Sequence, residues 1–173
     1  WFIDPQTRMN PHMRYGQLIP GICDGRPIGL IELGSEDRIV HALGFLSEDP
    51  DYAATLSGMR VWIAEMLDWL LLPGGFGEEE CRNGNNHSTW CVAHMAVFAA
   101  FLDREDVIPV CVKWYREELL PQIAADGSLP KELARTRSYH YSKYALDPFA
   151  LICEVALKYG INLWHEENAV GGS

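Results

Sequence analysis

The chain has 173 residues, of which 48% are hydrophobic, and a formal net charge of −10 at pH 7. This length and composition predict one globular domain with a sizeable core. The acidic balance argues against a general nucleic-acid binder. No run of 18 apolar residues occurs, so the sequence predicts no membrane-spanning segment.

The charge is unevenly distributed along the chain. Residues 31–80 hold eleven acidic residues and two arginines, whereas residues 127–145 hold four basic residues and Glu132 as their one acid. An acidic protein of this kind can still present a local site for an anion.

The first segment, residues 8–29, reads RMNPHMRYGQLIPGICDGRPIG and places polar side chains among turn residues. This pattern predicts a loop, and by itself it is weak evidence for a site. The polar residues are Arg8, Asn10, His12, Arg14, Gln17 and Arg26. The longest alternating stretch in the chain is PIGLIEL at 27–33, so no substantial β-sheet is expected.

Two helices are predicted next. Ser35, followed by two acids, begins a short helix that runs to Leu46. Apolar residues with i, i+3, i+4 spacing then predict an amphipathic helix over roughly 52–72, which PGGFG ends.

The stretch NGNNHSTW at 83–90 precedes the apolar run CVAHMAVFAAFL. Ser88 or Thr89 is a suitable N-cap for a helix. Residues 88–102 are apolar on nearly every face, which indicates a helix surrounded by other helices. The two asparagines and His87 before it either form a turn or present polar groups to a ligand at the helix N-terminus.

The remaining segments are helical as well. Residues 105–120 are amphipathic with a charged KWYREE face, DGSLP is a turn, and Pro148 and Gly160 bracket a last helix as first-turn residue and C-cap. Buried and surface helices alternate along the chain, as in stacked helical hairpins. The sequence therefore predicts an all-α fold.

The segment RTRSYHYSKYAL at 135–146 gathers basic and phenolic side chains. If it is helical, Arg137, Tyr141 and Tyr144 lie at i, i+4 and i+7 on one face. An arginine beside two phenols suits binding of a carboxylate together with proton transfer. The alternative is a solvated basic face on which the tyrosine rings pack.

Two further groupings are less informative. His87, Cys91 and His94 share a helical face and could bind zinc, but no fourth ligand is evident, so core packing is favoured and no metal site is predicted. Three of the five cysteines lie in apolar helices, while Cys23 and Cys81 lie in loop-like sequence and could form a bridge, although free thiols are favoured.

Taken together, several motifs resemble the alginate lyase superfamily of α/α-toroid polysaccharide lyases. They are NNHSTW (85–90), ADGSLPKELARTRSYHYSKYAL (125–146), INLW (161–164) and the upstream MNPHMRYGQLIPG with GRPIG. The resemblance covers nearly the whole of residues 1–173 as a single domain. It is to the later part of such a domain, which implies an incomplete toroid with its N-terminal part absent.

The resemblance implies cleavage of an acidic polysaccharide by β-elimination, without a cofactor, by a secreted enzyme. Asn86 and Arg137 would neutralise the substrate carboxylate, with His87 as a further neutralising group or as the base. Tyr144 matches the phenol of alginate lyases and Tyr141 that of relatives with RTRSxxYS, so either is the proton donor, with Tyr144 favoured. Substrate-binding candidates are His12, Gln17, Arg26, Arg135 and His140.

Two departures from the family pattern concern specificity. Ala145 stands where relatives often have asparagine, which leaves the preferred uronate open, and Ser88 replaces a glycine. A second hypothesis is an inactive relative that binds acidic polysaccharide without cleaving it. Neither hypothesis involves nucleic acid or a membrane, and a possible partner is the absent N-terminal part of the same domain.

Overall fold

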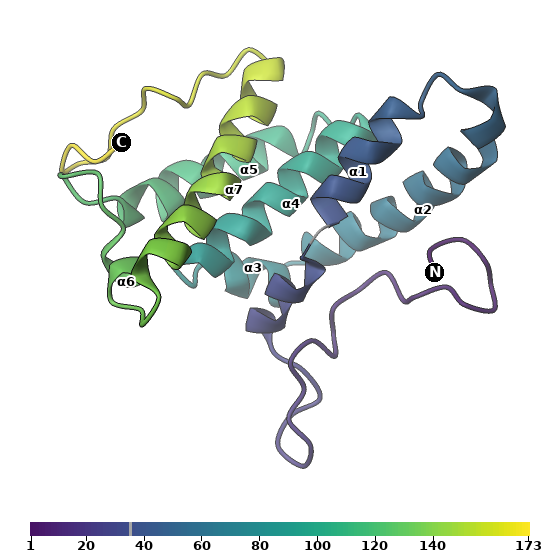
Figure 1. Cartoon of the computed structure of the whole chain (residues 1–173), viewed down its shortest axis with the longest axis horizontal. Helices are drawn as coiled ribbons and strands as arrows, with labels where there is room; N and C mark the ends of the chain where they lie inside the picture. Colours follow the sequence, from purple (N-terminus) through teal and green to yellow (C-terminus); the bar gives the residue numbers. More distant parts are fainter. Residues whose placement is uncertain (35) are drawn as a thin grey trace.

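A computed structural model describes residues 1–34 and 36–173 and contains no strand in these ranges (Figure 1). The helices are α1 (Glu36–Phe45), α2 (Ala53–Leu70), α3 (Phe76–Cys81), α4 (Asn86–Leu102), α5 (Ile108–Trp114), α6 (Pro130–Leu133) and α7 (Ser138–Lys158). Shorter helical segments are η1 (Pro27–Leu33), η2 (Pro50–Tyr52), η3 (Tyr115–Leu119) and η4 (Leu120–Gln122). The predicted all-α class is confirmed.

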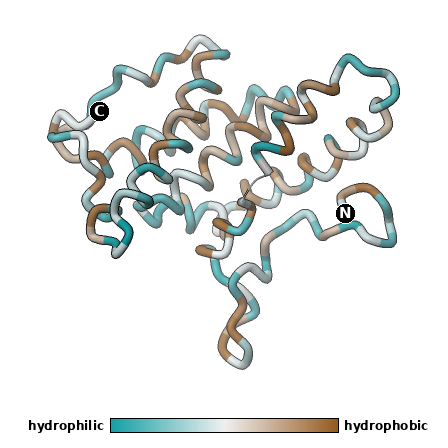
Figure 2. The backbone as a smooth tube through the Cα atoms, viewed as in Figure 1, coloured by the Kyte–Doolittle hydropathy of each residue, from teal (hydrophilic) through white to brown (hydrophobic). Residues whose placement is uncertain are grey.

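Helix α4 is the centre of the molecule. It packs against α1, α2, α3, α5 and α7, and its residues are buried almost without interruption from Asn86 to Ala99. The hydropathy colouring of Figure 2 follows this arrangement, with hydrophobic residues running along the central helices. The prediction of an inner helix surrounded by others is therefore confirmed.

Helices α4 and α7 lie side by side and point in the same direction. Near their first turns, the rings of Trp90 and Tyr144 are 5.0 Å apart. Near their last turns, Phe101 and Val155 line the same cavity. The N-termini of both helices therefore lie at the same end of the molecule.

The N-terminal segment is held against α2 and η1. The indole nitrogen of Trp62 donates a hydrogen bond to the carbonyl of Met9 at 2.9 Å. Gly16 and Gly29 lie so close that a Cβ on Gly29 would stand 2.4 Å from the Gly16 carbonyl oxygen. This backbone contact fixes the loop between them, which carries Gln17 and Arg26.

Several predicted boundaries differ from the structure. The last helix does not begin at Pro148, because α7 runs from Ser138 through Pro148 to Lys158. Gly160 follows this helix with a φ of +77°, as expected of a residue just beyond a C-cap. PIGLIEL forms the 3₁₀ helix η1, and Ser35, the predicted start of the first helix, lies outside the described residues.

The cysteines do not pair as Cys23 with Cys81. All five thiols are free, and the sulfur of Cys81 instead lies 3.8 Å from that of Cys91 in the core. None of the helices in the described residues combines the length and apolar content needed to cross a bilayer.

Candidate functional site

The N-terminus of α4 is capped by Asn85 and not by Ser88 or Thr89. The Asn85 side chain accepts a hydrogen bond from the backbone N–H of His87 at 2.9 Å, and the hydroxyl of Ser88 accepts one from the Asn85 N–H at 3.2 Å. This reciprocal capping box satisfies donors that a helix start leaves free. It leaves the next two side chains, Asn86 and His87, for other partners.

Asn86 is held by a buried carboxylate from α6. Its side-chain nitrogen donates to both oxygens of Glu132, at 3.0 and 2.9 Å, and its backbone N–H donates to one of them at 2.7 Å. Asn86 is 1% exposed and Glu132 2% exposed. One carboxylate therefore fixes the side chain of Asn86 and ties α6 to the start of α4.

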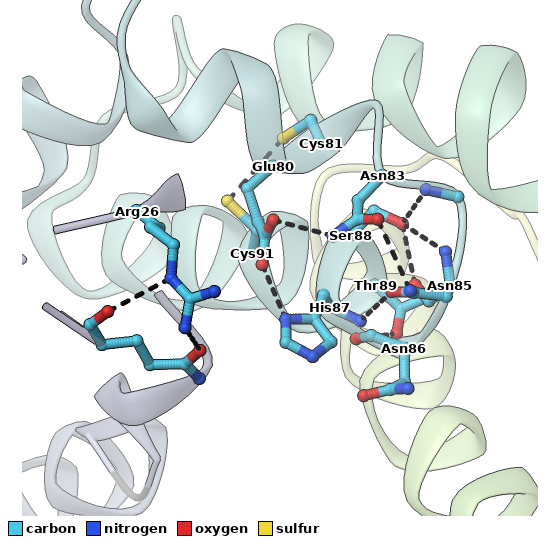
Figure 3. A network of polar contacts seen from close by, with 12 residues as sticks. Arg26, Glu80, Cys81, Asn83, Asn85, Asn86, His87, Ser88, Thr89 and Cys91 are labelled. Atoms are coloured by element: carbon cyan, nitrogen blue, oxygen red, sulfur yellow. Dashed lines mark hydrogen bonds and ion pairs between the residues drawn. The ribbon is translucent and has the colours of Figure 1, made fainter. Parts of the chain in front are cut away.

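His87 is held by a second buried carboxylate. Its Nδ1 lies 2.9 Å from Oε1 of Glu80, the penultimate residue of α3 (Figure 3). The other oxygen of Glu80 accepts a hydrogen bond from the Asn83 amide at 3.0 Å. The His87 side chain is 19% exposed and that of Glu80 only 1%, so the ring bridges a buried acid and the surface.

Tyr144 approaches this end of α4 from α7. Its ring lies 5.0 Å from that of Trp90, one helical turn beyond Asn86, and is stacked on His140 at 6.1 Å with an interplanar angle of 6°. Burial, reinforced by the negative charge of Asp37, raises the pKa of the Tyr144 phenol. The phenol therefore stays protonated at neutral pH and is suited to donating a proton.

Tyr141 and the two arginines are arranged differently from the sequence prediction. Arg137 is the N-cap of α7, with φ −118° and ψ 56°, and is exposed. It is Arg135 whose guanidinium lies over the Tyr141 ring, 4.0 Å from its centre. Within the described residues, the Arg137 side chain makes no hydrogen bond or ion pair, so its guanidinium can receive an anion.

The upstream candidates fall into two places. Arg26 precedes η1, which packs on α3 and α4, and its guanidinium donates to the backbone oxygen of Gln17 at 3.1 Å and to its side-chain oxygen at 3.0 Å. His12 instead packs near Trp69, with ring centres 6.0 Å apart. It lines a separate surface cavity of about 460 Å³ between the N-terminal segment and α2.

The structure thus brings Asn86, His87 and Tyr144 to the end of the α4–α7 pair where both helices begin. Each helix N-terminus carries a partial positive charge, and Arg135, Arg137 and His140 add donors around the start of α7. Such an end is suited to a polyanion that carries a carboxylate on each sugar.

Sequence reasoning missed the two carboxylates that hold the site. Glu80 was one acid in the run EEE, and Glu132 was the lone acid of a basic segment. Only Glu132 could have been noticed in the sequence, because a single acid within a basic segment suggests that it has a specific partner.

On the helical face shared by His87, Cys91 and His94, the second and third side chains are buried in the core. No group of three or more metal-binding side chains gathers in the described ranges. Cys91 is buried against Cys81, and His94 is buried beneath Trp90, with ring centres 5.7 Å apart.

Comparison with known proteins places the chain in a family. Residues 1–173 match the family model described as alginate lyase. The chain belongs to the alginate lyase family. The resemblance inferred from the motifs is thereby confirmed, and with it the α/α-toroid class of fold.

Individual relatives agree with this family. An alginate lyase of Cobetia marina is 32% identical over 111 residues, which are 64% of this chain and 29% of that protein. An alginate lyase of Pseudomonas entomophila (strain L48) is 38% identical over 144 residues, 79% of this chain and 37% of that protein. The chain therefore spans about a third of the length of these curated relatives.

A solved structure supports the same assignment. The crystal structure of an alginate lyase from Bacteroides ovatus superimposes with a TM-score of 0.92 at 29% sequence identity. The superposition covers 100% of the chain described here and 46% of the Bacteroides ovatus chain. The arrangement of helices described above is thus similar to that of one part of a known alginate lyase.

Proposed function

We propose that the protein cleaves an acidic polysaccharide of the alginate or polyuronate type by β-elimination. Membership of the alginate lyase family supports a polysaccharide lyase. The observation that assigns this function to a particular site is the ring contact between Tyr144 and Trp90. Trp90 lies one helical turn after Asn86 and His87. This contact packs the phenol of α7 against the turn of α4 that follows the amide and the imidazole.

The chemistry requires the proton on carbon 5 of a uronate to become acidic. The neighbouring carboxylate opposes this, because its negative charge resists a developing carbanion. Donors placed on the carboxylate neutralise it and stabilise the enolate-like transition state. We assign this role to Arg137, whose guanidinium is exposed, and, from the family resemblance, to Asn86, whose side chain Glu132 holds in place.

The elimination then needs a proton acceptor and a proton donor. One candidate acceptor is His87, which takes the proton from carbon 5, while the electron pair of that C–H bond forms the double bond between carbons 4 and 5. The bond from carbon 4 to the glycosidic oxygen breaks, and the oxygen receives a proton from Tyr144. Tyr144 could instead perform both transfers, according to the stereochemistry of the sugar, with His87 then neutralising the carboxylate.

Further along the polymer, other polar side chains would hold neighbouring sugars. Arg135 and His140 flank the two tyrosines, and Arg26 with Gln17 lies in the loop before η1. His12 would contact a more distant unit, since it lines a separate cavity. The polymer is too large to cross a membrane unaided, so we place the action outside the cell.

The test is direct, because elimination creates a conjugated double bond that absorbs ultraviolet light. The protein is incubated with polymannuronate, polyguluronate and glucuronan, and absorbance and product size are followed. An increase in absorbance with at least one polymer supports the lyase proposal, provided that the increase is absent with the His87→Ala variant. Binding of a polymer without any absorbance would instead favour the second candidate, an inactive polysaccharide-binding protein of the same fold.

A further inference from the structure

Glu80 and His87 form a pair whose geometry goes beyond a chance surface contact. Oε1 of Glu80 lies 2.9 Å from Nδ1 of His87 (Figure 3). The two residues come from different helices, α3 and α4, and the short loop between them is itself tied down by Asn83 and Asn85. The imidazole ring is therefore held in one orientation through its Nδ1 atom.

The burial of Glu80 makes this contact necessary for the fold as well as for the ring. A carboxylate that is 1% exposed must have its oxygens satisfied, because an unpaired buried charge is very costly. The Asn83 amide serves one oxygen at 3.0 Å, and His87 serves the other. The neighbouring acid Glu79 is exposed, so water can solvate its carboxylate and it has no comparable need for protein partners.

The consequence concerns which ring nitrogen carries the proton. A carboxylate can only accept a hydrogen bond, so the His87 nitrogen that faces it must be the protonated one. In the neutral ring, Nε2 is then left with a free lone pair. We propose that Glu80 is a positioning residue that fixes the Nδ1–H tautomer of His87 and thereby presents Nε2 as the proton acceptor of the reaction.

This assignment rests on the proposed function and deepens it. Of the two roles left open for His87, it selects the base, because a neutral ring with Nδ1–H has no proton on Nε2 with which to neutralise a substrate carboxylate. If Glu80 were itself protonated, the hydrogen bond would reverse and His87 would carry its proton on Nε2. The two arrangements give opposite tautomers and can be distinguished.

The first experiment measures the tautomer in the wild-type protein. Nitrogen-15 NMR of the uniformly labelled chain is recorded at pH 9, where an ordinary imidazole is neutral, and the His87 signals are identified by their loss in His87→Gln. We expect a protonated, pyrrole-type Nδ1 and an unprotonated, pyridine-type Nε2. A pyrrole-type Nε2 would overturn the proposal without reference to any activity.

The second experiment separates positioning from general stability. Glu80→Gln removes the charge while keeping the size of the side chain, and Glu79→Gln makes the same change at an exposed neighbour on α3. We expect Glu80→Gln to lower kcat by about 10²-fold, the cost of misplacing a catalytic group, with KM within about threefold of the wild type. Glu79→Gln should leave both parameters unchanged.

The outcomes separate this inference from the proposed function. If the wild type cleaves no uronate polymer, the lyase proposal fails while the NMR result still decides the tautomer. If the wild type is active and Glu80→Gln keeps full kcat with an altered tautomer, His87 is not the base and the positioning role is wrong. Should Glu80→Gln fail to fold, the wild-type spectrum remains decisive.

Discussion

At the scale of single residues, Tyr141 and Tyr144 are one turn apart on α7 but have different neighbours. The Tyr141 ring is covered by the guanidinium of Arg135, whereas Tyr144 packs on Trp90 near the start of α4. The first arrangement suits a supporting side chain. The second places a phenol, with its pKa raised by burial, beside the candidate site.

We therefore expect Tyr144→Phe to lower turnover by about 10²- to 10⁴-fold, the usual contribution of a general acid, with little change in polymer binding. The ring remains in this variant and only the hydroxyl is lost, so its packing on Trp90 is kept. Steady-state kinetics with Tyr141→Phe as the matched control tests this. Loss of activity in Tyr141→Phe with full activity in Tyr144→Phe would reverse the assignment.

Asn86, His87, Arg137 and the tyrosines could be nominated from the sequence because the motifs that carry the family resemblance are contiguous, whereas the residue types alone left other readings open. The partners of these residues were not predictable. Glu132 reaches Asn86 across 46 positions, and such pairing depends on how α6 sits against α4. Arg137 was expected on the same helical face as Tyr141, but the helix begins after it.

At the scale of elements, the polar interior of α4 has a measurable consequence. His94 is buried, and within the described residues neither ring nitrogen has a hydrogen-bond partner. Burial lowers the pKa of His94 from 6.5 to about 4. Between pH 6.5 and 4, His94 is therefore protonated in the unfolded chain but neutral in the folded chain. The free energy of unfolding consequently falls as the pH is lowered over this range.

This group should contribute a loss of about 3 kcal/mol over that pH range. Denaturant unfolding at a series of pH values should show a shallower pH dependence in His94→Phe than in the wild type. His41→Gln, which changes an exposed histidine on α1, should leave the dependence as it is. An unchanged slope in His94→Phe would mean that His94 titrates normally in the fold.

The loop before η1 depends on a contact between two backbones. A methyl group at position 29 would stand 2.4 Å from the Gly16 carbonyl oxygen, and neither backbone can move aside cheaply. We expect Gly29→Ala to lower the free energy of unfolding by about 1–3 kcal/mol, as overpacking does. Gly44→Ala on α1, where nothing lies within 4 Å, should instead stabilise by about 0.5–1 kcal/mol. Thermal melts of both variants test this pair, and equal shifts would contradict it.

Helix existence was predictable from apolar spacing, whereas helix boundaries were not. The helix predicted over roughly 52–72 corresponds to α2 (Ala53–Leu70), because a long amphipathic pattern with helical spacing is compatible with few other structures. Pro148 was predicted to lie in a first helical turn, yet it lies in the middle of α7, where the packing of this helix against α4 and α5 outweighs the local cost of a proline.

At the scale of the whole molecule, the net charge of −10 opposes the approach of a polyanion, while the basic start of α7 attracts it. The local attraction should dominate binding, because salt screens interactions beyond about 10 Å at moderate ionic strength. We expect KM for a polyuronate to rise with added salt, and to rise less in Arg135→Gln. A KM that falls with salt would show that the acidic surface governs encounter.

Pro148 lies four residues after Tyr144 on α7. Because proline has no N–H, the Tyr144 carbonyl cannot receive the hydrogen bond that another residue would donate at this position. The second half of the helix is anchored in the core by Phe149, Ile152, Cys153 and Ala156. The first half of the helix bears the charged and phenolic groups, and it joins the second half at the turn where this backbone hydrogen bond is missing. A break in the backbone hydrogen-bond ladder therefore separates the turns of α7 that carry the candidate site from the turns that anchor the helix in the core.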